Sequence, residues 1–183
     1  MKRSPWFPLA LAALLVACAH AGGGSPAPMG FTLATPEGWK QVASEDPIVF
    51  LTKDGGYKQF IMGQERPLDK PFQFTQKLIH KEMSPGQAAE VIFTEIAADQ
   101  NIRNFSMLES VTAQIAGKNG FRLMFVYTDA DNFSFKVIYY GFIHGNFLYS
   151  LRYGATNDEF FQKDLKSFQQ VLASFKLTPA KAP

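Results

Sequence analysis

The chain has 183 residues and carries 18 Lys and Arg against 16 Asp and Glu, for a formal net charge of +2 at pH 7. Hydrophobic residues make up 46% of the sequence and include 18 phenylalanines, a composition that excludes a disordered protein. Cys18 is the only cysteine, so an internal disulfide is excluded as well.

The N-terminus has the pattern of a secretory signal peptide. Lys2 and Arg3 precede an apolar run over residues 6–17 that only Pro8 interrupts. This run is too short to cross a membrane, which takes roughly 20 residues, but it is typical of a signal-peptide core behind a basic start. We therefore predict that residues 1–17 are a signal peptide that is removed.

The apolar run ends in Leu15-Val16-Ala17-Cys18, which resembles the lipobox of bacterial lipoproteins. The resemblance implies cleavage between Ala17 and Cys18 and attachment of a diacylglycerol to the Cys18 thiol. Ala19 stands where an aspartate would signal retention in the inner membrane. We therefore expect a lipid anchor on the periplasmic face of the outer membrane. The alternative is an ordinary signal peptide with a spare thiol.

Residues 18–29 are predicted to be the lipidated cysteine and a flexible tether, because Gly22-Gly23-Gly24 and Pro26-Ala27-Pro28 dominate them. Ten residues of this kind reach about 35 Å when fully extended. Loss of Lys2 and Arg3 with the signal peptide leaves 16 basic against 16 acidic residues. A neutral protein lacks the positive surface that nucleic acid attracts, so we expect no nucleic-acid partner.

Residues 30–177 are long enough for one domain, and residues 178–183 are a short tail. In the first part of the domain, alternating apolar residues predict short strands. The strands are Phe31-Thr32-Leu33, which stops at the turn Pro36-Glu37-Gly38-Trp39, and a hairpin of 48–52 and 57–63 around Asp54-Gly55-Gly56. Residues 67–83 show no clear pattern and are predicted to be a long loop with some local structure.

Two capping boxes predict helices. Ser84-Pro85-Gly86-Gln87 opens a helix that extends to about Asp99, and Thr156-Asn157-Asp158-Glu159 opens another. The second helix carries an apolar stripe with spacings of 4, 3, 4 and 3 residues, which predicts a seam buried against the rest of the domain. The residues of the stripe are Phe161, Leu165, Phe168, Leu172 and Phe175.

Between the two helices, four segments with short turns predict an antiparallel meander. Residues 107–116 and 121–128 flank the turn Gly117-Lys118-Asn119-Gly120, and residues 133–144 and 147–153 flank Gly145-Asn146. Both faces of 133–144 are apolar, although a strand with one face in water would alternate with polar residues. We therefore expect an α+β fold with one helix on each face of an antiparallel sheet of about six to seven strands.

The same features resemble the PsbP-like superfamily over residues 30–177. They are the start Gly30-Phe31-Thr32-Leu33, the Pro36-Glu37-Gly38-Trp39 turn, a middle helix, the meander, and the closing segment of residues 171–177. The resemblance implies an α/β/α sandwich. It also implies a non-catalytic role in assembly or binding, because members of the superfamily are mostly of that kind.

The sequence assigns no catalytic, cofactor-binding or metal-binding residues. The histidines His20, His80 and His144 lie in separate segments, which does not favour a metal centre. Asp129-Ala130-Asp131-Asn132 begins like a calcium loop but lacks its glycine and distal glutamate, so a hairpin turn is the better interpretation. A serine triad assembled from distant residues is the enzymatic alternative.

Two hypotheses of function follow. The first is a membrane-anchored, non-catalytic module that binds an envelope protein or complex through its surface. The alternative is a carrier or sensor that holds an apolar small molecule against the sheet, which the many aromatic residues suggest. Because no polar group stands out as an anchor for a small ligand, we predict a filled core or an exposed apolar patch and no pocket.

Overall fold

The computed structural model describes residues 29–44, 47–56 and 58–178 of the chain. The predicted signal peptide, the cleavage site at Ala17, the lipidated Cys18 and nearly all of the tether lie outside these residues. So does the tail after Thr178.

Seven antiparallel strands form the main sheet, in the spatial order β2-β3-β4-β8-β7-β6-β5. The meander of β5 to β8 is as predicted, and β4 pairs with β8 to join the first half of the domain to it. The strands are β2 (Lys40–Val42), β3 (Ile48–Thr52), β4 (Gln59–Pro67), β5 (Arg103–Ile115), β6 (Lys118–Thr128), β7 (Ser134–His144) and β8 (Phe147–Thr156).

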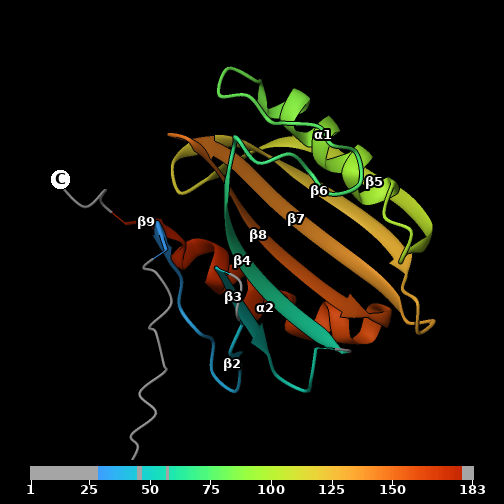
Figure 1. Ribbon diagram of the computed structural model, residues 1–183. Helices are drawn as coiled ribbons and strands as arrows, with labels where there is room; N and C mark the ends of the chain where they lie inside the picture. The colour runs from blue at the N-terminus through green and yellow to red at the C-terminus, as the bar shows by residue number, and fades with distance from the viewer. Residues whose placement is uncertain (1–28, 45–46, 57, 179–183) are drawn as a thin grey trace, which may run out of the picture.

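A second, two-stranded sheet joins the two ends of the domain. In it β1 (Phe31–Thr32) pairs with β9 (Lys176–Leu177). The rings of Phe31 and Phe175 stack at 5.0 Å between centroids, which anchors this small sheet to the core. The two ends of the described chain therefore lie side by side, as Figure 1 shows.

One helix covers each face of the main sheet, so the predicted α/β/α arrangement is confirmed (Figure 1). Helix α1 (Pro85–Ala97) begins at the capping box of Ser84 and Gln87, as expected. Helix α2 (Asn157–Ser174) follows Thr156, but the Thr156 side chain makes no cap hydrogen bond. Its hydroxyl instead donates to the Lys58 carbonyl at 3.3 Å, so the second capping box is wrong although the helix start is right. Within the described chain, neither helix is long and apolar enough to cross a membrane.

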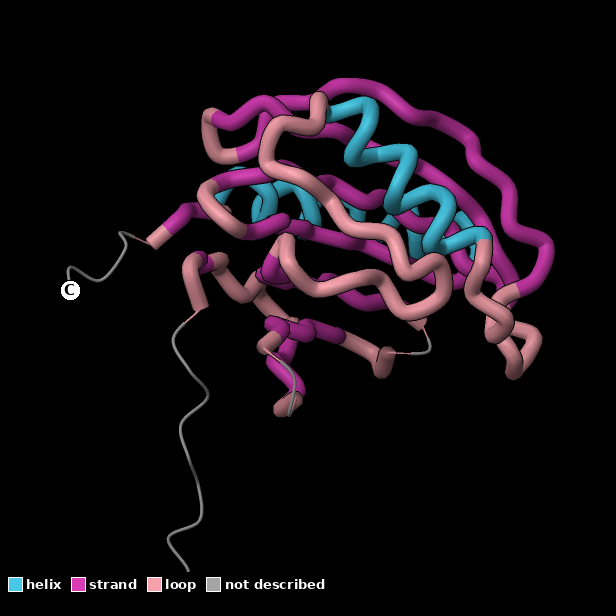
Figure 2. Tube along the Cα trace, turned by 45° about the horizontal axis from the view of Figure 1, so that its top comes forward, coloured by secondary structure: helices cyan, strands magenta, loops and turns pink. Residues whose placement is uncertain are grey.

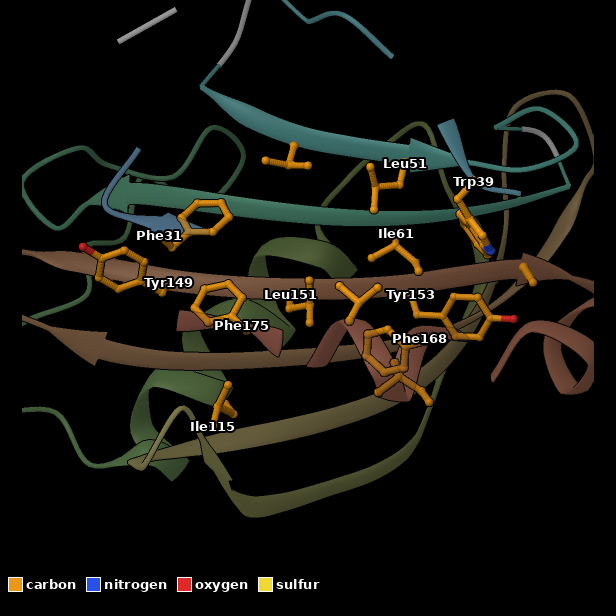
Figure 3. Close-up of a cluster of buried hydrophobic side chains, with 14 of the residues drawn as sticks. Phe31, Trp39, Leu51, Ile61, Ile115, Tyr149, Leu151, Tyr153, Phe168 and Phe175 are labelled. Atoms are coloured by element: carbon orange, nitrogen blue, oxygen red, sulfur yellow. The ribbon is translucent and has the colours of Figure 1, made fainter. Parts of the chain in front are cut away.

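The core between the sheet and α2 contains the predicted seam. Phe161, Phe168 and Phe175 are at most 3% exposed, and the two leucines of the stripe are partly buried. Figure 3 shows Phe168 and Phe175 facing Tyr153, Leu151 and Tyr149 of β8. The Phe168 and Tyr153 rings stack at 5.2 Å, so the helix is held by aromatic contacts along its length.

The core on the other face lies under α1. Phe135, Val137 and Tyr139 of β7 are buried there, while Ile138 and Phe142 of the same strand belong to the core under α2. The two apolar faces of this strand are therefore both covered, as its sequence predicted. The segment between β4 and α1 is a loop that runs beside the helix (Figure 2) and buries Phe72 and Ile79.

The turn between β5 and β6 differs from the prediction. The two residues at the turn are Ala116 and Gly117, both with positive φ, while Asn119 and Gly120 belong to β6. Gly120 is required inside the strand, because a Cβ there would collide with the Gly141 carbonyl oxygen of β7. The Asn-Gly pair is therefore explained by close strand packing and not by turn geometry.

Candidate functional site

Helix α1 is too narrow to cover its face of the sheet. Seven strands span roughly 30 Å across, whereas a helix with its side chains is about 10–12 Å wide. The helix packs against β5, β6 and β7. The same face of β3, β4 and β8 is left to the long loop before α1, which leaves a hollow between loop, helix and sheet.

We call this hollow the basin. It has a volume of about 500 Å³ and is lined by side chains from β3, β4, β6, β7, β8, α1, the long loop and the short loop after α1. The prediction of a filled core or a flat apolar patch is therefore wrong for this face. A filled core would need a second helix over β4 and β8, and the chain between β4 and α1 forms a loop instead.

Much of the basin wall is apolar. Phe60 and Met62 of β4, Ile96 of α1, Phe125 of β6 and Leu148 of β8 contribute to it. Phe60 stacks on Phe50 of β3 at 5.7 Å and is also tilted against Phe135 of β7. This aromatic packing keeps the floor of the basin rigid.

A cluster of polar side chains interrupts the apolar floor at its centre. Arg152 of β8 lies over the Tyr139 ring, with 4.7 Å from its Cζ to the ring centroid. Its Nη2 donates to Oε1 of Gln64 on β4 at 3.1 Å, and Ser150 lies two residues before it on the same strand face. Arg152 Nε is buried and has no hydrogen-bond partner among the described residues.

The rim of the basin is held in place by side chains that are already engaged. Arg66 stacks on Phe72 at 4.3 Å and donates from Nη2 to the Lys70 and Pro71 carbonyl oxygens. Across the basin, the Glu95 carboxylate of α1 accepts from the Phe74 and Thr75 backbone amides and from the Thr75 hydroxyl at 2.8–3.0 Å. These contacts tie the long loop to both walls.

Tyr127 lies in the wall contributed by β6. Its burial, and then the negative charge of Asp129, raise its pKa to about 12, while the nearby charge of Arg152 opposes the increase. The phenol is therefore a neutral hydrogen-bonding group at any physiological pH. It adds a further polar group to the basin without adding a charge.

A family comparison decides which fold family this is. The model of the PsbP family matches residues 27–177 of the chain. The chain belongs to the PsbP family. The resemblance noted in the sequence is confirmed over almost the same residues. No curated protein sequence matches the chain significantly.

Solved structures show the same PsbP fold at low sequence identity. The solution structure of cyanobacterial PsbP (CyanoP) from Synechocystis is 14% identical with a TM-score of 0.53, and the match covers 81% of this chain and 87% of that one. LpqN of Mycobacterium tuberculosis, described as involved in cell envelope biogenesis, is 14% identical with a TM-score of 0.51. That match covers 81% of this chain and 83% of LpqN.

The residues considered for metals do not come together in this PsbP domain. His80 lies in the long loop and His144 at the end of β7, while His20 lies outside the described residues. Within the part of the chain that the structure describes, no three His, Cys, Asp or Glu side chains gather as a metal site would require. Asp129 instead closes the predicted turn, because its side chain accepts from the Phe133 amide at 2.8 Å.

We did not predict the basin residues from the sequence, although the pattern of residues in β8 indicates them. On β8 the face with Tyr149, Leu151 and Tyr153 is apolar, whereas Ser150 and Arg152 lie on the other face. A charged residue in the middle of a strand that is paired on both sides is unusual. It indicated that this face of the strand was incompletely covered.

Proposed function

We propose that this PsbP-family protein is a membrane-anchored, non-catalytic binding module of the bacterial cell envelope that holds its partner in the basin. The lipobox at Cys18 and the tether behind it support the anchor. LpqN, which has the same fold, is described as involved in cell envelope biogenesis, and an envelope role for this chain agrees with that.

The basin is the observation that carries the binding role. It is formed from five strands, one helix and the loops on both sides of that helix, and its walls are fixed by the contacts of Arg66 and Glu95. A rigid apolar hollow with polar groups in its floor is the usual form of a binding site. The opposite face of the sheet, by contrast, is closed by α2 over a filled core.

In the first form of this function, the basin receives a segment of an envelope protein and the domain serves as an interaction or assembly module. A photo-crosslinking residue in place of Gln73, at the exposed rim of the basin, should then give one discrete protein adduct in intact host cells. The same residue in place of Gln169, exposed on α2, is the matched control and should give none. Equal adducts from both positions would contradict a partner at the basin.

In the second form the module is a carrier or sensor of a small molecule. The volume of about 500 Å³ favours this candidate, because small-molecule sites typically have roughly 300–1,000 Å³. Native mass spectrometry of the protein purified gently from its host should then show one stoichiometric small molecule. That species should be lost when Phe60→Trp fills the basin. If the small molecule still binds to the Phe60→Trp variant, its site lies outside the basin.

A further inference from the structure

Arg152 is a cation without a counter-ion in the floor of the basin. The ion pairs between described residues are Lys53 with Asp164 and Arg122 with Glu109, and neither involves it. Its terminal Nη2 is bonded to the neutral Gln64 amide, and its Nε lacks any partner in the described part of the chain. The described residues therefore satisfy only part of the hydrogen-bonding capacity of this guanidinium, and none of them neutralises its charge.

The acidic side chains that line the basin do not supply the missing charge. Glu95 is committed to the backbone amides of the long loop, as described above. Asp99 accepts from the backbone amide and the side-chain amide of Asn101, each at 2.9 Å. Placing a charged group in an apolar wall costs free energy unless an opposite charge or strong hydrogen bonds compensate it. A ligand anion would provide that compensation.

The groups around Arg152 favour a ligand that has a carboxylate headgroup on an apolar chain. A planar guanidinium matches the two oxygens of a carboxylate better than it matches a single acceptor. Because Gln64 accepts from Arg152 through its Oε1, its NH₂ group is left to donate to one of those oxygens. Phe60, Met62 and Ile96 offer apolar surface beside this polar cluster.

We infer that the basin binds a small amphipathic carboxylate, with its headgroup on Arg152 and Gln64 and its apolar chain against Phe60 and Met62. This inference rests on the proposal that the basin is the binding site, and it narrows the carrier form of that proposal to one ligand class. Arg152 is the residue that determines specificity, because its charge has no ion pair and its Nε has no hydrogen-bond partner among the described residues.

The test uses the mature chain, residues 18–183, with Cys18→Ser to remove the lipid and keep every described residue. Dodecanoate is titrated by calorimetry at neutral pH, and dodecan-1-ol provides the same chain without the charge. We expect one dodecanoate per protein, bound about tenfold or more tightly than the alcohol, because charge-assisted bonds form only with the carboxylate. The Arg152→Gln variant should lose that advantage and bind the two probes alike.

Arg122→Gln is the matched control, because it makes the same change on β6 of the same sheet, where Arg122 pairs with Glu109 and does not line the basin. It should bind dodecanoate as the unaltered chain does, and circular dichroism should show both variants folded. Equal binding of acid and alcohol, no binding of either, or an unchanged dodecanoate affinity in Arg152→Gln would overturn the inference. The basin itself is tested separately, since the crosslink at Gln73 and the Phe60→Trp comparison do not depend on charge.

Discussion

Phe168 shows how a single side chain holds α2 on the sheet. It is 1% exposed and lies against the rings of Tyr153 and Tyr140. Phe168→Ala should lower the free energy of unfolding by about 3–5 kcal/mol, the usual cost of removing a buried phenylalanine. Gln169→Ala, next to it on the exposed side of the helix, should be nearly silent. Urea unfolding of both variants measures this, and equal losses would mean that the seam does not face the core.

Tyr127 makes the stability of the domain sensitive to alkaline pH. In the unfolded chain its phenol ionises near 10.0, whereas in the folded basin the pKa is about 12. Between these values the unfolded state releases a proton that the folded state keeps. The contribution is therefore complete below pH 10 and is lost as the pH rises through this window, by up to about 1.4 kcal/mol per pH unit.

Tyr127→Phe should remove that dependence. Urea unfolding of the variant at about pH 9 and about pH 11 should show a smaller loss of stability than the unaltered chain shows over the same interval. Burial also raises the pKa of Tyr153, so some alkaline loss remains in the variant. Parallel losses in the two proteins would contradict the raised pKa of Tyr127.

At the scale of elements, sequence patterns correctly predicted the features that depend on residues close together in the chain. Ser84 and Gln87 make both bonds of their capping box, and the alternation in 133–144 correctly indicated a strand with both faces covered. The wrong predictions concern features that depend on contacts between residues far apart in the chain. The Thr156 hydroxyl bonds to Lys58, nearly a hundred residues earlier, and Gly120 is required by the approach of Gly141.

The basin could not be predicted in the same way, because it depends on where α1 stops covering the sheet. The sequence gives a helix of the right length, but its position over β5, β6 and β7 follows from the pairing of all seven strands. The loop before α1 has no periodic pattern, and its course is set by single contacts such as those of Glu95 and Arg66. The most useful local signal was Arg152 in the middle of a paired strand.

Glu95 allows the role of the long loop to be tested. Burial alone would raise its pKa, but the hydrogen bonds from Phe74 and Thr75 outweigh it and hold the pKa below the ordinary 4.5. These bonds are present above that value and are lost as the pH falls through the folded pKa. Glu95→Gln removes the charge and should speed hydrogen exchange of the amides at 74–75 by up to roughly tenfold at neutral pH.

Glu90→Gln, on the exposed side of the same helix, is the control for that measurement and should leave the exchange unchanged. Acidification should bring the unaltered chain toward the behaviour of Glu95→Gln. If the amides at 74–75 exchange equally in all three proteins, the carboxylate does not hold the loop, and the wall of the basin must be fixed by other contacts.

At the scale of the whole molecule, β1 and the basin belong to opposite faces of the main sheet. The described chain enters through β1, and Phe31 of that strand packs in the core under α2. The basin opens on the α1 face. With the proposed anchor at Cys18, the tether would therefore join the domain on the side away from the basin. With that anchor, the predicted reach of the tether, about 35 Å, would keep the basin within a short distance of the membrane.

The anchor itself is tested at Cys18. Cys18→Ser removes the thiol that would take the diacylglycerol, so the protein should leave the membrane fraction or accumulate as an uncleaved precursor. A single acyl chain binds only marginally, and stable attachment needs two or more, so loss of the lipid should release the protein almost completely. Fractionation with radiolabelled fatty acid measures both effects, and Ser25→Ala in the tether should change neither. A serine variant that still fractionates with membranes as a mature-sized, lipid-labelled protein would show that the anchor lies elsewhere. In that case the orientation of the basin would no longer follow from the position of β1.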